Sequence, residues 1–542
     1  MSHSGSFRGA PAKSGLRCSL LWQPLSFIAL LSFLLAWSGG GFRVVMLSGP
    51  AMASERPLVV VLGSAPATLD PFLASDANGV RISHQLIFET LVRLGDDLEI
   101  APGLARWERP SPARFQFTLM EGARFSDGTP VEAEDAVHTL RTFMAPDTGS
   151  PYGAGLREKF SKAEATGKRT FALTLQPAFA GVPDGLLMSA LVLPVVSRSH
   201  PGAGSNDPTA LLGSGPFRLD SRRPGEIVLL RNSHHPRPAG VARVVFKMVK
   251  DENTRQLKFR KGDVDLGINV VPLDKVVHFG RAPLDKRYRI LEAPGLSFQY
   301  LGFNLRDPIL AKPRVRRAIA HAIDVETLIV HRQKGHSSRA TGLFPPGSPY
   351  ADPSVKPLLH DPALANRLLD EAGFPMKDGR RFSLVYKTST DRSAVIQARV
   401  IAENLRKAGI EVSVRSLEWA TYYADIKKGN FQLYSLRWIG VSDPGFLVEL
   451  LHSGKAPPNG RNRGHYGNPA MDQLLEQTRT VRDGEALRKV ARAVHRLAAE
   501  DLPYLGLWHN NNLAVVSRDL EGFRLHPSGG FEHLSQVRWR AP

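Results

Sequence analysis

Two tryptophans and one arginine in the C-terminal half of the chain have the residue types and spacing of a small-molecule binding site. Trp419 opens a short predicted helix that Gly429 ends, and Arg437 and Trp438 lie near the end of an apolar predicted strand, 431–439. Ligands of open α/β sheets bind just beyond the carboxyl ends of the strands. An indole offers a wide apolar face with one donor, and a guanidinium offers forked donors that suit an anionic or carbonyl group. The alternative is structural: the tryptophans could equally fill core space, and Arg437 could form a salt bridge.

Other reaction chemistry finds little support in the sequence. His234 and His235 form the only adjacent histidine pair, but no carboxylate lies at helical spacing from them, which favours a surface loop over a metal site. The segment Gly213-Ser214-Gly215 lacks both the strand–serine–helix context of a nucleophile elbow and the full spacing of a phosphate loop. We therefore predict no catalytic residue, no metal and no cofactor, and keep an exported hydrolase as the alternative from another class.

The segments that must position the site alternate between strand and helix. Residues 382–386 and 410–415 are typical of strands, and a predicted helix over 395–407 separates them before the chain reaches the strand 431–439. Such alternation predicts an α/β fold in which helices cover mixed sheets. A chain of 542 residues is too long for one core, so two or three lobes are expected, and residues 100–200 have the character of a separate insert.

Two further helices are predicted in the first third of the chain. Apolar periodicity predicts a helix over 80–92. Thr129 has the position of an N-cap, Pro130 stands at the first helical position, and Glu132 completes a capping box, which together predict a helix over 131–143.

The charge and cysteine content exclude several classes of protein. The formal net charge is +19, but the basic residues are spread along the chain and form no run with interleaved aromatics. Solvated surface charge is therefore preferred over nucleic-acid binding, with attraction to an anionic ligand or surface as the second interpretation. The arginines 314, 316 and 317, at the start of a predicted helix, are interpreted as one such solvated face. The single cysteine, Cys18, excludes an internal disulfide and an all-cysteine metal cage.

Residues 1–53 have the pattern of an export signal. Three basic residues and no acid precede an apolar run over 20–37, and Ala51-Met52-Ala53 fits the small-residue cleavage pattern. Export to the periplasm after cleavage is predicted. An uncleaved membrane tether is the alternative, because the apolar run is close to the length of a membrane span.

Several motifs, taken in their order, resemble the large solute-binding proteins of bacterial peptide and nickel ABC importers, the dipeptide- and oligopeptide-binding family. The likeness covers roughly residues 57 to 525. The motifs are Leu69-Asp70-Pro71, Phe88-Glu89-Thr90-Leu91, Pro102-Gly103-Leu104-Ala105, Phe125-Ser126-Asp127-Gly128-Thr129-Pro130, Gly213-Ser214-Gly215-Pro216-Phe217, Gly262-Asp263-Val264-Asp265, Val315-Arg316-Arg317-Ala318-Ile319 and Glu371-Ala372-Gly373.

The resemblance implies a periplasmic-binding-protein-like clamp of type II, with two lobes and an extra domain inserted in the first. Lobe 1 is expected over 54–95, 205–295 and 503–542, the inserted subdomain over 96–204, and lobe 2 over 296–502. The implied protein is a monomer that captures a peptide or small molecule without covalent chemistry. Its implied partners are an inner-membrane ABC permease and its ATPase subunits, and nucleic acid is not expected. A ligand-sensing periplasmic subunit is the alternative role.

The resemblance also implies a set of ligand-binding residues. These are Trp419, Trp438, Arg437, Gly440, Tyr422, Asn304, Ser75 and Asp443.

The chain departs from the family's pattern at one position that bears on the ligand. Peptide-binding members place an aspartate shortly after the second tryptophan, where it pairs with the amino terminus of the peptide. Here Val441 follows Gly440, and the nearest acid, Asp443, matches the family's turn aspartate instead. Valine cannot neutralise an ammonium group, and an unpaired buried charge is costly. We therefore expect that peptides with a free amino terminus are not the preferred ligand.

Overall fold

The computed structural model describes residues 56–200, 204, 211–481 and 484–540. The predicted export signal, 1–53, lies outside this range. None of the helices within the described residues is long and apolar enough to cross a membrane.

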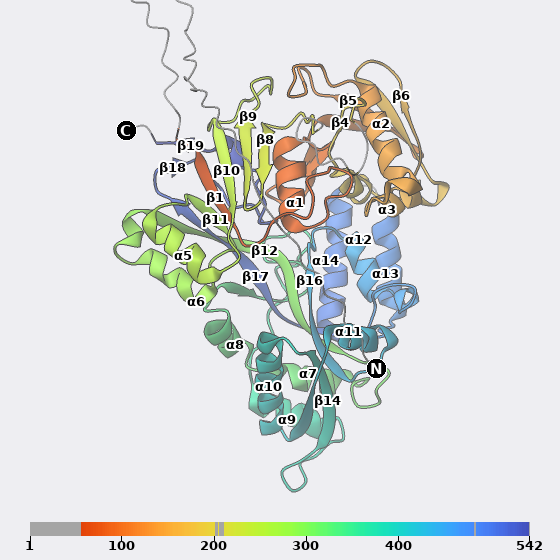
Figure 1. The fold of residues 1–542 in the computed structure, drawn as a ribbon. Coiled ribbons are helices and arrows are strands. Elements are labelled where there is room, and N and C mark those ends of the chain that lie inside the picture. Colours follow the sequence, from red (N-terminus) through yellow and green to blue (C-terminus); the bar gives the residue numbers. More distant parts are fainter. Residues whose placement is uncertain (1–55, 201–203, 205–210, 482–483, 541–542) are drawn as a thin grey trace, which may run out of the picture. The chain divides into compact units, whose positions relative to one another are not determined.

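Most strands belong to one mixed sheet of eleven strands (Figure 1). In the order in which they pair, ten of them are β15 (Ile410–Leu417), β14 (Phe382–Ser389), β16 (Leu433–Ile439), β12 (Tyr288–Phe303), β17 (Tyr504–Ser517), β11 (Leu266–Ile268), β1 (Leu58–Leu62), β10 (Arg243–Met248), β9 (Glu226–Arg231) and β8 (Phe217–Arg223). The eleventh, β13 (Ser337–Arg339), pairs with β17. The pairs that β14 forms with β15 and β16, and that β1 forms with β10 and β11, are parallel. The mixed α/β sheet that the sequence predicts is therefore confirmed.

The strands β12 and β17 run through the middle of this sheet. They pair antiparallel from Tyr288 opposite Ser517 to Gly302 opposite Tyr504, with a register shift between Pro294 and Phe298. Beyond this shift, β12 also pairs with β16 along its other edge. The same two strands therefore hold the strands β1 and β8–β11 on one side and β14–β16 on the other. The predicted lobe boundary at 295/296 falls within the register shift, and the lobe boundaries stay a prediction.

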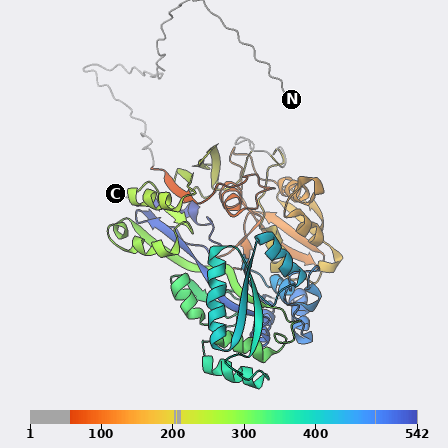
Figure 2. The same cartoon turned by 60° about the horizontal axis from the view of Figure 1, so that its bottom comes forward.

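Helices cover both faces of the part of the sheet that carries β14–β16. On one face, α7 (Pro313–Ala322), α8 (Val325–Arg332), α9 (Pro362–Glu371) and α10 (Arg392–Lys407) form one core with the strands. The helix α10 lies against β14 and β15, teal in Figure 2. The other face packs against α11 (Trp419–Lys428), α12 (Gly445–Leu451), α13 (Pro469–Thr480) and α14 (Gly484–Asp501). The strands and helices predicted over 382–439 are confirmed.

A separate antiparallel sheet of four strands lies within the predicted insert. Its order is β4 (Ala105–Ser111), β5 (Arg114–Leu119), β7 (Thr170–Leu175) and β6 (Phe160–Ala165). The helices α2 (Ala133–Met144) and α3 (Gly153–Lys159) pack against it. The rings of Phe117 and Phe171 stack at 4.9 Å within its core.

The remaining elements are short. They are α1 (Ala77–Ile82), β2 (Val92–Leu94), β3 (Ile100–Pro102), α4 (Asp184–Met188), α5 (Glu252–Lys261), α6 (Leu273–Val276), β18 (Leu520–Glu521) and β19 (Arg538–Trp539).

The helix predicted over 131–143 begins two residues later than expected, and Thr129 is not its N-cap. Thr129 instead donates its hydroxyl to Asp127 at 2.6 Å, and the backbone of Pro130 pairs with Arg124. These bonds keep 124–130 in a turn. Glu132 therefore takes the N-cap position of α2, and the Asp135 carboxylate accepts its backbone N–H at 2.9 Å.

The helix predicted over 80–92 is also shorter than expected. It begins at Ala77 after the N-cap Asp76 and ends in a wide turn over Ser83–Ile87. The segment Gly213-Ser214-Gly215 packs against this turn so closely that a Cβ on Gly213 or Gly215 would overlap the carbonyl oxygens of Leu86 and Ile87. The two glycines thus allow the backbone of 213–215 to pack directly against the backbone of the turn over Ser83–Ile87.

The interpretation of arginines 314, 316 and 317 as a solvated face is wrong for Arg316. Its side chain is 4% exposed and donates to the carbonyl oxygens of Leu310, Ala311 and Leu502, and also to that of Asp501. It therefore joins the turn before α7 to the end of α14. A cation that satisfies carbonyl groups in this way cannot be told from a surface arginine by helical periodicity alone.

A buried histidine in β17 makes the stability of this region dependent on pH. The ring nitrogens of His509 lie 3.1 Å from the carbonyl oxygens of Ser297 and Gly342, and burial lowers the pKa of His509 to about 4. Burial also lowers the pKa of His84 to about 4.

We predict that the thermal unfolding midpoint decreases as the pH falls from about 6.5 toward 4. The unfolded chain, with an ordinary histidine pKa of 6.5, takes up a proton that the folded protein accepts only near pH 4, so the loss is complete below that value. The variant His509→Gln should show a shallower slope across this window, with the contribution of His84 remaining. Equal slopes for the variant and the wild type would contradict the assignment to His509.

Candidate functional site

The strand β16 places its two predicted site residues on opposite faces of the sheet. Successive side chains of a strand alternate between faces, and the register of β16 with β12 is continuous, with Trp438 opposite Phe298 and Arg437 opposite Gln299. Trp438 therefore shares a face with Tyr434 and belongs to the core under α11–α14. Arg437 shares the other face with Leu433 and is exposed.

Two residues that were not among the predicted site residues, Arg463 and Tyr423, lie between Trp438 and Trp419 and connect them. The Arg463 guanidinium carbon lies 4.3 Å from the centroid of the Trp438 ring and 5.3 Å from that of Tyr423. The Tyr423 ring in turn stacks on Trp419, with centroids 5.7 Å apart and an interplanar angle of 10°. We call these four residues, Trp419, Tyr423, Arg463 and Trp438, the ledge. Its outer end is accessible, because Trp419 is 53% exposed, whereas Trp438 is only 8% exposed.

Tyr300 of β12 supports the ledge from beneath. Its ring stacks on Trp438 at 6.0 Å and on Phe298 at 5.7 Å, and it meets the edge of Tyr434 at 5.7 Å. Tyr434 in turn packs so closely against Gly302 that a Cβ there would overlap its ring. These contacts fix the position of the Trp438 indole before any ligand arrives.

The ledge is rich in hydrogen-bond donors and contains no carboxylate. Arg463, 6% exposed, donates to the hydroxyl oxygens of Tyr300 at 3.2 Å and Tyr423 at 3.1 Å. Although burial lowers the pKa of Arg463, the phenol oxygens around it raise the pKa above the ordinary value, and the group stays charged. The Trp438 Nε1–H is buried and has no acceptor among the described residues.

Two other predicted site residues use their polar groups on the protein itself. The Tyr422 hydroxyl donates to the carbonyl oxygen of Ser435 at 2.6 Å, and burial raises its pKa. The Asn304 amide donates to the carbonyl oxygens of Gly429 and Phe431 at 3.1 and 2.7 Å. Both side chains tie α11 to β12 and β16, and their contact with a ligand stays a prediction.

The segment after β16 contains the remaining predicted residues of this region. Gly440 is exposed with φ 76°, and its N–H donates to the Leu296 carbonyl at 2.8 Å. Val441 is buried. The Asp443 carboxylate accepts the Gly445 N–H at 2.9 Å at the start of α12, and its enclosure raises its pKa. It thus has the role of a turn residue.

The predicted contribution from the first lobe is exposed. Ser75 precedes Asp76, the N-cap of α1. Within the described residues, no hydrogen bond or ring contact joins Ser75 to the ledge. Its role as a ligand contact stays a prediction, as do those of Arg437 and Gly440.

The histidine pair differs from expectation in one member. His234 is exposed, but His235 is buried, with its ring nitrogens 2.7 Å from the Arg237 carbonyl and 3.2 Å from the Glu89 carboxylate. Among the described residues, no group of three or more histidine, cysteine or acidic side chains could hold a metal ion.

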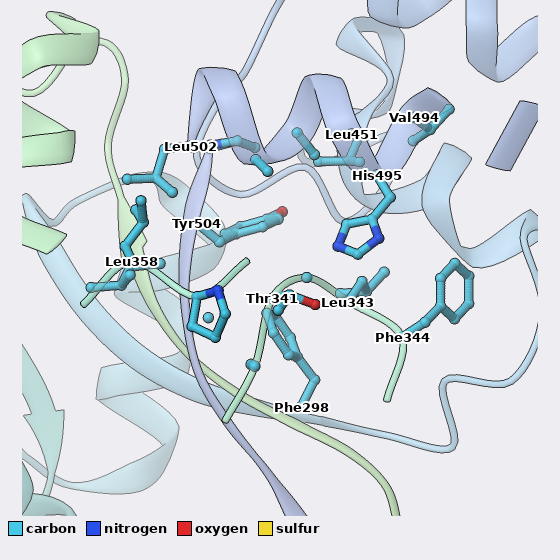
Figure 3. A pocket seen from close by; sticks show the side chains of 18 of the residues that line it. Phe298, Thr341, Leu343, Phe344, Leu358, Leu451, Val494, His495, Leu502 and Tyr504 are labelled. Atoms are coloured by element: carbon cyan, nitrogen blue, oxygen red, sulfur yellow. The ribbon is translucent and has the colours of Figure 1, made fainter. Parts of the chain in front are cut away.

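A separate cavity of about 80 Å³ lies behind Phe298 (Figure 3). Its walls are mainly apolar and include Leu343, Phe344, Leu358 and Tyr504. None of the eight predicted site residues lines it. Phe298 and Tyr504 separate it from the ledge, because the rings of both contact Tyr300, at 5.7 and 5.1 Å. The cavity is therefore distinct from the candidate ligand site.

The sequence alone does not mark Arg463 or Tyr423 as site residues, for two different reasons. Tyr423 follows Tyr422 in the same helix, and only the stacking on Trp419 distinguishes it. Arg463 lies in a segment without periodicity between α12 and α13, 25 positions after Trp438 in the numbering. A hint was present in the alternation Arg461-Asn462-Arg463 without a nearby acid.

Residues 99–457 match the family described as Bacterial extracellular solute-binding proteins, family 5 Middle, and the chain belongs to this family. Protein XP55 of Streptomyces lividans is 28% identical over 498 residues, which cover 89% of this chain and 88% of XP55. The periplasmic murein peptide-binding protein MppA of Escherichia coli K12 is 26% identical over 519 residues, covering 88% and 92% of the two chains.

The solved structure of MppA in its unliganded open form has a TM-score of 0.77 to this chain. The match has 23% identity and covers 90% of this chain and 98% of MppA. It confirms the expected α/β clamp with two lobes.

We predict that Tyr422→Phe lowers the free energy of unfolding by about 1–3 kcal/mol, because the partly buried Ser435 carbonyl then loses the hydroxyl donor of Tyr422. Denaturant unfolding measures the change. Thr421→Ser, a conservative change at an exposed position of the same helix, serves as the control and should have little effect. A Tyr422→Phe variant as stable as the wild type would show that the hydroxyl has no structural role.

Proposed function

We propose that this chain is the extracytoplasmic solute-binding component of an ABC importer. It captures a peptide or peptide-like small molecule between two lobes in the periplasm and delivers it as a monomer to an inner-membrane permease with ATPase subunits. No bond of the solute is altered. Membership in the solute-binding family supports this role, and the observation that carries it is the ledge: a partly exposed indole leading to buried, preorganised donors.

The physical mechanism of capture follows from the ledge and from the ladder of β12 and β17. The exposed face of Trp419 offers apolar area to the solute, and the donors at the inner end fix its polar groups. The affinity reflects the contacts of the closed state less the free-energy cost of closing. Because β12 and β17 belong to both halves of the large sheet, the hinge in this proposal lies at their register shift.

Retention of a solute tests this function directly. Native mass spectrometry of protein purified without refolding should show a bound small molecule. The variant Trp419→Ala should lose it, with binding weakened by about tenfold or more, because the aromatic face is removed.

The control for this experiment is Leu359→Ala, which removes another exposed apolar side chain outside the ledge and should keep the solute. Both variants should unfold near the wild-type temperature, since both side chains are more than half exposed. Equal retention by wild type and Trp419→Ala would remove Trp419 from the site.

The nature of the ligand's amino end gives a second prediction. Val441 is buried and brings no charge to the segment after Trp438, so a free ammonium group gains no partner there. Calorimetry with unmodified di- to pentapeptides should show no tight binding that depends on the amino terminus. Tight binding that disappears on N-acetylation of the same peptides is the opposite outcome and would refute the expectation.

A further inference from the structure

The buried arginines of the chain share a pattern from which Arg463 departs. Arg316 donates to backbone carbonyls, Arg255 donates to the carbonyls of Val249, Lys250 and Val270, and Arg381 pairs with Asp370 at 2.5 Å. Carbonyl oxygens and carboxylates carry the partial or full negative charge that a buried cation needs. Each of these three arginines therefore has a structural role that its acceptors explain.

Within the part of the chain that the structure describes, the Arg463 guanidinium has two acceptors, both phenol oxygens. Both belong to the ledge and its support, Tyr423 and Tyr300, and no described carboxylate forms a salt bridge with Arg463. Phenol oxygens are neutral acceptors, as carbonyl oxygens are, but Arg463 has two of them where Arg316 has four carbonyls. The face of the Trp438 ring adds a cation–π contact, which is weaker than an ion pair. Among the described residues, the buried positive charge of Arg463 therefore has no anionic partner.

A second buried donor lies against Arg463. The Trp438 ring centroid is 4.3 Å from the guanidinium carbon, and no described residue supplies an acceptor for its Nε1–H. Buried donors without partners are costly, and proteins retain them where a ligand supplies the acceptor. The inner end of the ledge thus combines one full positive charge and one free donor with no acceptor of its own beyond the phenols.

We propose that the inner end of the ledge binds a carboxylate of the captured solute, with Arg463 as the charge partner and Trp438 Nε1–H as a second donor. This inference rests on the proposed function and adds the charge of the solute. One buried guanidinium balances one negative charge, which fits a carboxylate better than a dianionic phosphate. Arg461, whose guanidinium carbon is 6.0 Å from the Trp438 ring centroid, is exposed and adds attraction at longer range.

The charge of this subsite is therefore the reverse of one that holds an ammonium group. Val441 removes the negative charge that the family resemblance implies after the second tryptophan, and Arg463 supplies a positive charge at that tryptophan's ring. Both features favour a ligand with a carboxylate over a ligand with an ammonium group at this subsite.

Three peptides that differ only in the charge of their amino end test the proposal. N-succinyl-trialanine amide carries a carboxylate, N-acetyl-trialanine amide is neutral, and trialanine amide carries an ammonium group. Calorimetry and tryptophan fluorescence should give the tightest binding for the succinyl peptide. In Arg463→Gln its affinity should fall at least about tenfold, to that of the acetyl peptide. Arg415→Gln, which removes the same charge at an exposed position of β15, should keep the wild-type preference.

The outcomes separate this inference from the proposed function. Equal affinity of wild type for all three peptides, or unchanged succinyl binding in Arg463→Gln, overturns the carboxylate subsite and leaves solute capture standing. If the wild type binds none of the peptides, the solute retained in native mass spectrometry decides: a molecule without a carboxylate overturns the inference. Absence of both peptide binding and a retained solute contradicts the proposed function itself.

A measurement without ligand shows whether Arg463 is merely structural. Thermal unfolding of the ligand-free protein should show a smaller decrease for Arg463→Gln than for Arg316→Gln, because Arg316 satisfies four carbonyl groups whereas Arg463 donates to two phenol oxygens. A decrease for Arg463→Gln as large as that for Arg316→Gln would indicate a structural arginine and overturn the proposal.

Discussion

The antiparallel ladder between β12 and β17 is the constraint on which the site depends. Backbone groups in the middle of a sheet must be paired, so these strands cannot shift without breaking bonds along both neighbours. A slip of β12 by one residue would also exchange its faces, moving Phe298 and Tyr300 from beneath the ledge to the opposite core. The position of Trp438 opposite Phe298 is thus set by the backbone pairing, and the aromatic contacts follow from it.

The ledge connects the paired strands to the surface, from the buried Trp438 to the exposed Trp419. Tyr434 packs closely against Gly302. The Tyr300 ring meets Tyr434 edge-on and stacks on Trp438. Trp419, at the outer end, stacks on the ring of Tyr423 and is about half exposed. A site built in this way holds its inner donors fixed while its outer aromatic face can adjust to different solutes.

The sequence predicted the parts of this arrangement that depend on local periodicity. The strand–helix–strand order over 382–439 follows from apolar spacing and from Gly429, and the structure has it in place. Strand alternation places Arg437 and Trp438 on opposite faces, but the local pattern did not show which face α11–α14 cover. Local patterns also could not show that the Thr129 hydroxyl donates to the Asp127 carboxylate. Nor could they show that Arg316 is buried and donates to the carbonyl oxygen of Leu502, just after α14. Arg463 was inaccessible for the same reason, since its significance arises from residues 40 and 163 positions away.

In this proposal the buried charge of Arg463 gains an ion-pair partner only when the solute binds. In the empty protein the phenol oxygens and the indole face keep the buried guanidinium charged, but none of the described carboxylates pairs with it. A carboxylate that enters the ledge adds an ion pair, and this favourable contact exists only in the bound state. An aspartate supplied by the protein near the same ring would neutralise the charge in advance, leaving less to be gained from an anionic solute. The buried Val441 and the lack of a carboxylate beside Arg463 among the described residues therefore act together. They leave the negative charge that pairs with Arg463 to be supplied by the ligand.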